Sequence, residues 1–465
     1  MEKKITRRSF LAAAAAVGLS TAALSLAGCG ASSASTAASA ASTASTASSA
    51  ASASKEPVTI EFWNGWTGPD GDLLTKLVDQ YNEKNQDNVT VKMDIMEFSS
   101  LTEKLTTALA SGTNPQLHLG FATGEYSLSG QYIPIDDVFD VSGLDKNDFD
   151  ESILANCYMN DHLYGLPFQL TCEYFYWNKD LFQKAGLDPE TPPKTWEEVA
   201  SFSKKIDALG GNTIGGGYTY NDSTLLGTMM RSFGGNVIED VDGAYASALT
   251  SDKNIASNKK ALQTIYDFAH QADSNMWKGT DYEAGFMAGT VGMLIGGAWE
   301  LAGCKTNKIN YGISLLPAGD AGIKMATWPI SMCVMKGTTG RKLEACYSFM
   351  NYWNNNINNP ITDECPAFEW TSQQAYQPYL KSVQSDSRLT SDPDYQVTSS
   401  FTKYLDNYFP ADFWNTYNLG TKVLGPLAEN YCTDAMSIDD AFDQAETDLE
   451  GIISDMHDVE ANAVK

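Results

Sequence analysis

Several tryptophan, amide and carboxylate side chains stand close to the ends of predicted strands. Asn64 and Trp66 follow the first strand, Asp70 stands just before a helix, Glu97 ends the second strand and Glu125 the third. Aromatic rings offer flat apolar faces, and amide and carboxylate oxygens accept hydrogen bonds. This combination suits noncovalent binding of a ligand that has apolar faces and a rim of hydroxyl groups.

Motifs for covalent catalysis are missing from the sequence. It contains no GxSxG, no HExxH and no Walker lysine loop, and the glycine-rich "GGNTIGGGY" lacks the lysine and spacing of a phosphate cradle. The paired carboxylates of a glycoside hydrolase could be chosen from 58 acidic residues, so that alternative stays open. No metal or other cofactor is expected, because the seven cysteines after Cys29 form no CxxC pair and the four histidines are scattered. Most of these cysteines are expected to be buried as small hydrophobic residues.

The elements that position the candidate side chains follow from the hydrophobic spacing. "VTIEFW" and "VTVKMDIM" alternate as strands do, and "QLHLGFA" is a third short strand. A helical pattern separates each from the next, and in the second of these Ser100 and Glu103 have the spacing of a capping box. The order predicts an α/β fold with a mainly parallel sheet, which binds ligands at the carboxyl ends of its strands. Further on, Thr195 and Glu198 form a capping box for a helix whose buried face includes Trp196.

The amino terminus has the pattern of an export signal. Four basic residues precede an apolar run from Phe10 to Leu26, and Leu26-Ala27-Gly28-Cys29 resembles the lipobox of bacterial lipoproteins. Residues 1–28 are therefore predicted to be a signal peptide, with Cys29 lipidated. "TRRSFL" resembles the twin-arginine motif, although Sec leaders also carry paired arginines, so the export route stays open. Residues 29–56, mostly Ala, Ser and Thr, predict a disordered tether between the membrane and a globular body.

Size and charge limit the possible partners. Removing the leader leaves 437 residues, enough for two lobes, and changes the net charge from −27 to −30, since four basic residues and one acid are lost. A surface this acidic disfavours nucleic acid and anionic lipid headgroups as partners.

The chain resembles a known family, the extracellular solute-binding proteins of sugar-type ABC importers, which includes maltose-binding protein. The likeness is carried by "VTIEFWNGWTGPDG", "LTTALASGTNPQ", "DHLYGLPFQLTCEYFYWNKDLFQKAGL", "PPKTWEEVASFSKKI", "YEAGFMAGTVGMLIGGAWE" and "YGISLLPAG", in that order. One departure is Gln116, which stands where the family usually has an acidic residue after the proline.

The resemblance implies a type II periplasmic-binding-protein-like fold, with two α/β lobes that close over a ligand by hinge motion. The first lobe is expected at residues 57–168 plus 322–362, and the second at 169–321 plus 363–465. The chain is expected to cross between them near 166–171, 318–326 and 361–368.

The resemblance also adds candidate ligand residues. Trp299 and Glu300 lie in "LIGGAWE", which matches a turn where the family's tryptophan stacks on sugar. Trp414 matches a second aromatic platform, Trp328 lies near the second crossing, and Gln169 lies in the first.

The function expected from these features is that of a monomeric receptor, anchored outside the cell membrane through Cys29. It would capture a neutral mono- or oligosaccharide and deliver it unchanged to a membrane permease driven by a separate ATPase. Alternatives are a binding protein for a glycerophosphate-type or other polyol ligand, which would need Arg or Lys at the cleft for a phosphate group, and a secreted glycoside hydrolase.

Overall fold

The structure, a computed structural model, describes residues 55–217, 219–241, 244–270, 282–406 and 418–462. The chain separates into two units, Met1–Ala53 and Ser54–Lys465, and every described residue belongs to the second. The predicted signal peptide and Cys29 lie outside the described residues, and so does Trp414. Among the helices of the described ranges, none has both the length and the apolar character that crossing a membrane requires.

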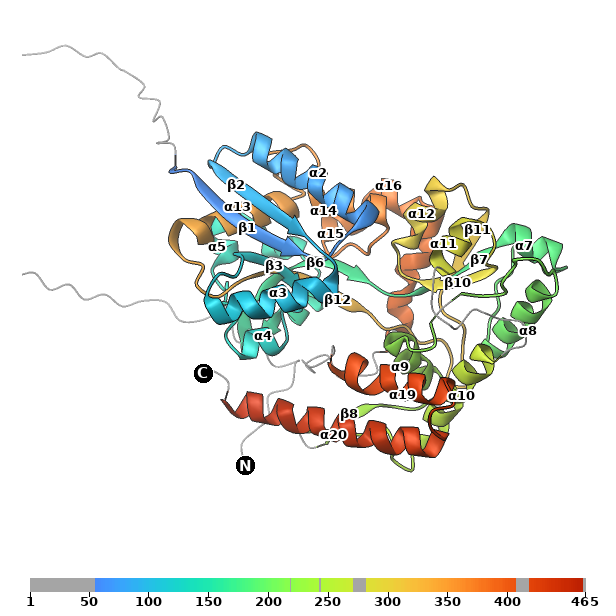
Figure 1. Ribbon diagram of the computed structural model, residues 1–465. Coiled ribbons are helices and arrows are strands. Elements are labelled where there is room, and N and C mark those ends of the chain that lie inside the picture. Colours follow the sequence, from blue (N-terminus) through green and yellow to red (C-terminus); the bar gives the residue numbers. More distant parts are fainter. Residues whose placement is uncertain (1–54, 218, 242–243, 271–281, 407–417, 463–465) are drawn as a thin grey trace, which may run out of the picture. The chain divides into compact units, whose positions relative to one another are not determined.

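The first sheet has five strands in the order β2-β1-β3-β12-β6 (Figure 1). Its strands are β1 (Val58–Asn64), β2 (Val89–Ile95), β3 (Leu117–Gly120), β6 (Gly165–Thr171) and β12 (Trp328–Val334). β1 runs parallel to β2 and β3, whereas β12 runs antiparallel to both of its neighbours, β3 and β6. The predicted alternation of three strands with two helices, α2 (Gly68–Lys84) and α3 (Phe98–Ser111), is confirmed. The capping box at Ser100 is wrong, because α3 begins at Phe98 with Glu97 as its N-cap residue.

Neighbouring residues of β1 show which helices cover each face of this sheet. The Phe62 ring packs against Phe349 of α13 (Gly340–Asn354), with 5.8 Å between ring centroids, and Tyr81 of α2 packs against the same Phe349 ring. The next residue, Trp63, faces the other way, where Lys104 of α3 lies 3.8 Å from its ring centroid. Because successive side chains of a strand point to opposite faces, α2 and α13 cover one face and α3 the other.

The second sheet has three strands in the order β10-β7-β11. These are β7 (Tyr174–Asn178), β10 (Met293–Gly296) and β11 (Tyr311–Ser314), and both β10 and β11 run antiparallel to β7. Residues 214–217 add a parallel neighbour through the bridges Ile214–Val291 and Gly217–Leu294. The two-lobe α/β class is confirmed, but this sheet is less parallel than expected. The physical reason is that β7 enters from the first sheet at the end where both of its neighbours leave.

The predicted helices of the second half are present. The Thr195 hydroxyl accepts a hydrogen bond from the Glu198 amide at 3.3 Å at the start of α8 (Trp196–Asp207), and Trp196 is buried. The prediction of a structural role for Trp196 is thereby confirmed. Three longer helices follow, α10 (Ile255–Ala269), α13 and α20 (Ile438–Asn462).

The remaining elements are short and complete the two lobes. They are α4 (Glu125–Leu128), α5 (Val138–Ser142), η1 (Lys146–Asp148), α6 (Glu151–Leu154), η2 (Ala155–Cys157), β4 (Tyr158–Met159), β5 (His162–Leu163), α7 (Lys179–Lys184), α9 (Ser223–Ser232), β8 (Ile238–Val241), β9 (Ala244–Ser247), α11 (Tyr282–Met287), α12 (Glu300–Thr306), α14 (Pro366–Gln374), α15 (Lys381–Gln384), α16 (Ser387–Thr390), α17 (Pro393–Thr398), η3 (Ser399–Tyr404), η4 (Leu419–Leu424) and α19 (Gly425–Cys432).

Contacts along the carboxyl-terminal third bear on where the chain crosses between the lobes. α14 packs against α2 and α13, and Leu380 forms a bridge with Phe149, so residues 366–384 lie with first-lobe elements. α17 contacts β11 of the second sheet, and its Asp394 accepts a hydrogen bond from Tyr311 at 2.6 Å. These contacts favour a third crossing near residues 385–393 rather than 361–368, and the division into lobes stays a prediction.

The second crossing is tied to the second lobe by an ion cluster. Asp406 accepts hydrogen bonds from the Arg231 guanidinium at 2.8 and 3.1 Å, and the Lys324 ammonium pairs with its other oxygen. Lys324 belongs to the segment between β11 and β12, where Met325 also bridges Leu405. The cluster therefore fixes one end of this crossing against α9.

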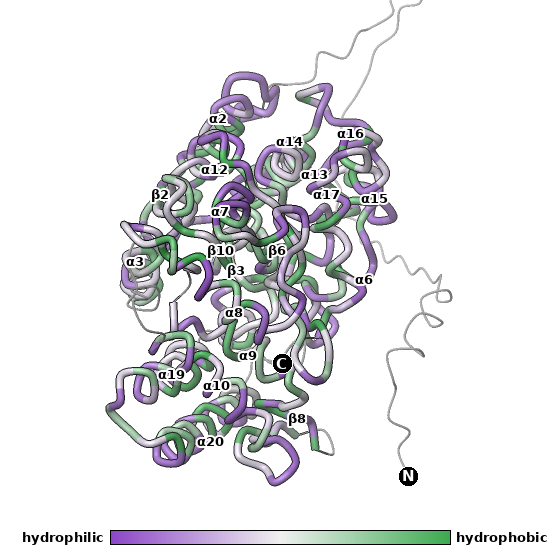
Figure 2. The backbone as a smooth tube through the Cα atoms, turned by 90° about the vertical axis from the view of Figure 1, so that its right-hand side faces the viewer, coloured by the Kyte–Doolittle hydropathy of each residue, from purple (hydrophilic) through white to green (hydrophobic). Residues whose placement is uncertain are grey.

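All seven described cysteines are buried and none forms a disulfide bond, and the burial agrees with what the sequence predicts for most of them. In Figure 2 the outer turns of the helices are largely purple, and helices such as α20 alternate between purple and green along their length. That alternation is the pattern of a helix with one face on the core.

Candidate ligand site between the two sheet edges

One edge of the first sheet gathers the predicted ligand residues. The carboxyl ends of β1, β2, β3 and β6 and the amino end of β12 all lie at this edge, because Gly120 pairs with Ser331 and Thr171 with Trp328. The chain leaves β6 here toward β7 and returns here into β12. Ligands of open α/β sheets bind at this kind of edge.

The matching edge of the second sheet is where these connections arrive. Tyr174 at the start of β7 pairs with Gly296 at the end of β10, and Phe175 pairs with Ser314 at the end of β11. Glu173 and the turn from Gly297 to Glu300 therefore lie at the edge that the crossings join to the first sheet.

Three predicted residues of the first lobe form one buried network. The Trp66 indole donates to the Gln169 side-chain oxygen at 3.2 Å, and the Trp370 indole donates to the same oxygen at 3.2 Å. The Asn64 side-chain oxygen accepts a hydrogen bond from the Trp66 backbone N–H at 3.1 Å. The Asn64 side-chain nitrogen, Nδ2, is buried without a hydrogen-bond partner. Trp66 is only 7% exposed, so its ring packs inside the edge of the sheet and offers little surface on which a ligand could stack.

Asp70 lies beside this network, in the first turn of α2. Its carboxylate accepts a hydrogen bond from the Tyr376 hydroxyl at 2.6 Å. Burial raises the pKa of Asp70 to about 6, and the Tyr376 hydrogen bond opposes that rise. The Tyr376 ring stacks on Trp370 at 5.5 Å between centroids, which joins Asp70 to the two indoles.

Two exposed phenylalanines at this edge are absent from the predicted set. Phe98 is 56% exposed, packs edge-on against Trp66 and lies so close to Gly65 that a Cβ there would come within 2.8 Å of its ring. Phe121, 38% exposed, follows β3. Their position shortly after the ends of two strands could have indicated a role in the site. An apolar ring that stays exposed at such an edge often marks a binding surface. The predicted carboxylates Glu97 and Glu125 are both exposed at the same edge.

Trp299 supplies an aromatic platform on the second lobe. Its side chain is 39% exposed, and it is folded over Gly297, where an added Cβ would meet the indole at 2.0 Å. Only glycine leaves room for this arrangement. The Gly297 carbonyl accepts a hydrogen bond from Tyr176 at 2.7 Å, which holds the turn to β7.

Glu300, next to Trp299, is 4% exposed and faces the Glu283 carboxyl of α11. Burial, together with the neighbouring Glu283 charge, raises the pKa of Glu300 to about 8, and burial also raises that of Glu283. The two carboxyl groups are therefore close enough to share a proton.

Trp328 and Trp414 complete the predicted set. The backbone of Trp328 begins β12 at the first-lobe edge. Trp414 lies outside the described residues. Within the described ranges no three or more His, Cys, Asp or Glu side chains are arranged to hold a metal ion. Two surface hollows, one between α19 and α20 and one beside Trp63 and Lys104, include none of the predicted ligand residues.

Curated proteins with similar sequences are binding proteins. The chain is 26% identical over 302 residues to a Brucella abortus protein named a putative binding protein, covering 63% of this chain and 71% of that protein. It is 25% identical over 340 residues to the sn-glycerol-3-phosphate-binding periplasmic protein UgpB of Escherichia coli, covering 70% of this chain and 75% of that protein.

Solved structures share the fold. A solute-binding protein of an ABC transporter from Thermotoga lettingae, bound with alpha-D-tagatose, matches with a TM-score of 0.72 at 19% identity, over 85% of this chain and 99% of that one. UgpB of Mycobacterium tuberculosis, in complex with glycerophosphocholine, matches with a TM-score of 0.72 at 20% identity, over 86% and 100% of the two chains. Finally, the family described as bacterial extracellular solute-binding protein matches residues 76–397, so this chain is a member of that family of transport proteins.

Proposed function

We propose that this protein is the extracytoplasmic receptor of an ABC importer and that it captures a mono- or oligosaccharide between its two lobes. The ligand would be handed unchanged to a membrane permease. The observation that carries this proposal is the pair of partly exposed aromatic surfaces, Phe98 on the first-lobe edge and Trp299 on the second. Aromatic faces flanked by carboxylates suit the apolar C–H faces and hydroxyl rim of a sugar.

Closure would couple binding to delivery. A ligand that contacts both edges stabilises the closed arrangement relative to the open one by its differential contacts. The supporting feature is the connection of the two sheets at a shared edge by residues 172–173 and 315–327, which lets the lobes move as units about short segments.

The test is calorimetry against a panel of neutral mono- and disaccharides, together with small-angle scattering. Saturable binding with a decrease in radius of gyration is expected, with no change in the sugar after incubation. Absence of binding across the panel would refute the proposal. Release of hydrolysed sugar would support the glycosidase alternative instead.

A glycerophosphate-type ligand is a second candidate, because UgpB of Escherichia coli is named for such a ligand. A phosphate group would need Arg or Lys to pair with. The described residues that we assign to the two edges include neither, so the sugar is the better-supported ligand. Including sn-glycerol 3-phosphate in the panel separates the two candidates.

We further propose that Cys29 carries the lipid anchor, on the evidence of the lipobox and the Ala/Ser/Thr tether. Cys29→Ala should move the protein from the membrane fraction to the soluble extracytoplasmic fraction. Retention of the variant in the membrane fraction would contradict this assignment.

A further inference from the structure

Four carboxyl groups come together at the second-lobe edge, each from a different element. Glu173 precedes β7, Asp222 is the N-cap residue of α9, Glu283 lies in the first turn of α11 and Glu300 opens α12. β7, β10 and residues 214–217 bring these element ends to one edge, since Tyr174 pairs with Gly296 and Gly217 with Leu294.

The four groups form two pairs with a tyrosine among them. Glu173 faces Asp222, and Glu283 faces Glu300. All four carboxyl groups raise the pKa of Tyr282, which burial already raises, so Tyr282 lies close to both pairs. Its side chain rests on Gly217, where an added Cβ would meet the Tyr282 Cβ at 2.6 Å.

No basic side chain balances these acids within the described part of the chain. None of the four makes an ion pair with Lys, Arg or His there. The basic residues of the same elements are paired elsewhere, since Arg231 of α9 binds Asp406 and Lys305 of α12 binds Asp394 at 3.2 Å. Even if each pair keeps one proton, the edge retains negative charge.

A buried acceptor at this edge is left without a donor. The Glu173 side chain is 9% exposed, and its Oε2 atom has no hydrogen-bond partner. An unsatisfied buried carboxyl oxygen is costly, and a ligand donor removes the cost. Burial and the neighbouring Asp222 raise the pKa of Glu173 well above its ordinary value, as expected for a carboxyl that lacks a cation.

Aromatic rings stand beside the acids. Trp299, directly before Glu300, keeps 39% of its surface exposed, and Tyr282 lies close to both acid pairs. Rings of this kind attract a cation through their faces and also stack on a sugar ring.

We propose that the ligand is a saccharide carrying a cationic amine, an amino sugar or an oligosaccharide that contains one, whose ammonium group is bound among Glu173, Asp222, Glu283 and Glu300. An ammonium group supplies three donors and the positive charge that this edge lacks. This inference rests on the proposed function and specifies the ligand class of the same site.

The experiment compares matched saccharides by calorimetry near pH 6.5, where the amine is protonated. The pairs are glucose with glucosamine, galactose with galactosamine, mannose with mannosamine, and cellobiose with the glucosamine disaccharide. N,N′-diacetylchitobiose is the uncharged amide control. The amino member of at least one pair should bind about tenfold or more tighter than its neutral counterpart, and acetylation should abolish that gain.

Proton release gives a second readout. Displacing a shared proton by an ammonium group makes the binding enthalpy depend on the ionisation enthalpy of the buffer, whereas a neutral ligand leaves it nearly constant. The titratable groups facing the two pairs are Tyr282 from α11, Tyr176 from β7, Cys304 from α12 and Cys172, the neighbour of Glu173 in the chain. In Glu300→Gln the release should be lost.

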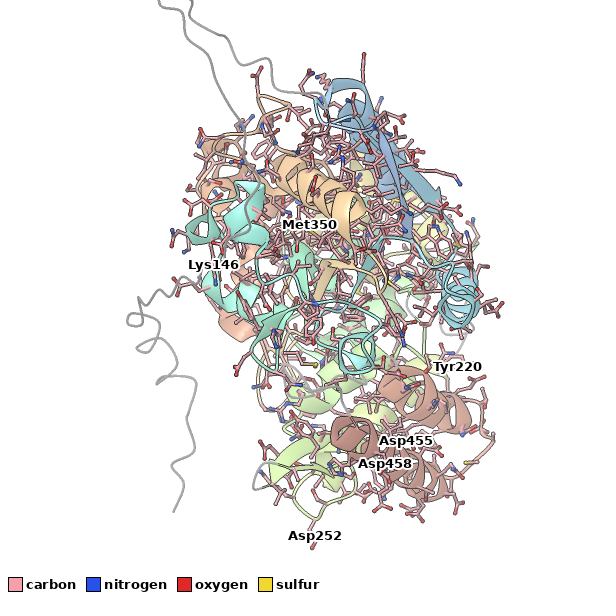
Figure 3. The ribbon with its side chains drawn as sticks, turned by 90° about the vertical axis from the view of Figure 1, so that its left-hand side faces the viewer. Lys146, Tyr220, Asp252, Met350, Asp455 and Asp458 are labelled. Atoms are coloured by element: carbon pink, nitrogen blue, oxygen red, sulfur yellow. The ribbon has the colours of Figure 1, made fainter. Side chains whose placement is uncertain are left out.

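Charge-neutral variants test which residues are responsible. Glu173→Gln and Glu300→Gln should each reduce the preference for the amine to about threefold or less, and a cooperative thermal unfolding transition shows that each variant is folded. Asp252→Asn removes one charge at an exposed position, seen at the lower end of the view in Figure 3, and should leave the preference unchanged.

The outcomes separate the two proposals. Binding of neutral sugars at least as tight as that of their amino counterparts would overturn the amine assignment and leave the sugar receptor intact. Binding of no saccharide at all would overturn both. Preference for sn-glycerol 3-phosphate would contradict the amine assignment and favour the anionic ligand.

Discussion

The Trp66 indole donates to the Gln169 side-chain oxygen at 3.2 Å, which links the loop after β1 to the carboxyl-terminal end of strand β6. Trp370 donates to the same oxygen, so one amide satisfies two buried indoles from distant parts of the chain. The first-lobe edge is therefore a fixed surface, held by polar bonds inside an aromatic cluster. The side chains that stay exposed at this edge, such as Phe98, are the ones available to a ligand.

Gln169→Ala should destabilise the protein by about 2–4 kcal/mol, because two buried N–H donors lose their acceptor. The measurement is the free energy of unfolding from urea titration. Gln86→Ala, at an exposed position on the chain after α2, is the control and should change it by less than about 0.5 kcal/mol. Equal effects of the two substitutions would show that the network does not stabilise the fold.

Trp299→Ala should weaken saccharide binding by about 1–3 kcal/mol, since an aromatic platform is lost from the second-lobe edge. Titration calorimetry with whichever saccharide binds gives the change in affinity. Val141→Ala, which truncates another exposed apolar side chain on α5, should leave the affinity unchanged. Unaltered affinity in Trp299→Ala would remove this residue from the site.

The raised pKa of Glu300 makes folding stability depend on pH. Between its ordinary value of 4.5 and about 8, the folded protein retains a proton at Glu300 that the unfolded chain has released. Stability should therefore fall as pH rises from about 4.5 to 8, by on the order of a few kcal/mol.

Melting temperatures of the ligand-free protein between pH 5 and 9 measure this dependence. Glu300→Gln cannot ionise, so its curve should be flatter and should lie above that of the wild type at pH 9. Glu83→Gln, at an exposed position on α2, serves as the control and should follow the wild type. A steep fall retained in Glu300→Gln would assign the dependence to another group.

Tyr376→Phe should raise the pKa of Asp70 above 6, because the hydroxyl that stabilises the ionised carboxylate is removed while burial remains. Carbon-detected NMR titration of the aspartate carboxyl groups measures this directly. Tyr404→Phe, at a 40% exposed tyrosine, should leave the Asp70 titration in place. A lower pKa in Tyr376→Phe would contradict the hydrogen-bond assignment.

Local patterns in the sequence predicted the elements well. The alternation in "VTIEFW" and the capping box at Thr195 correspond to β1 and to the start of α8. The start of α3 was missed because Ser100 also fits a cap, yet Glu97 occupies that position in the structure. Strand direction in the second sheet depends on where the chain enters from the first, which local patterns do not contain.

The site was harder to predict than the fold. Asn64, Trp66 and Gln169 do meet, but their hydrogen bonds are made to one another, which follows only from the folded path of β1 and β6. The members of the two second-lobe acid pairs lie 49 and 17 residues apart and belong to different elements, so no spacing along the chain indicates that they are paired. Trp299 and Glu300 entered the candidate set through the resemblance of "LIGGAWE" to a turn of the family, and their role in binding stays a prediction.

The seven buried thiols have a practical consequence for a protein that belongs outside the cell. Since no disulfide bond joins the described cysteines, the body of the molecule needs no oxidant to fold and can be refolded in reducing buffer. Burial raises the pKa of Cys157 and of Cys365 to about 12, which keeps both sulfurs unreactive while the protein is folded. The rate of thiol alkylation should therefore report how often the folded interior opens. A bound ligand should lower that rate.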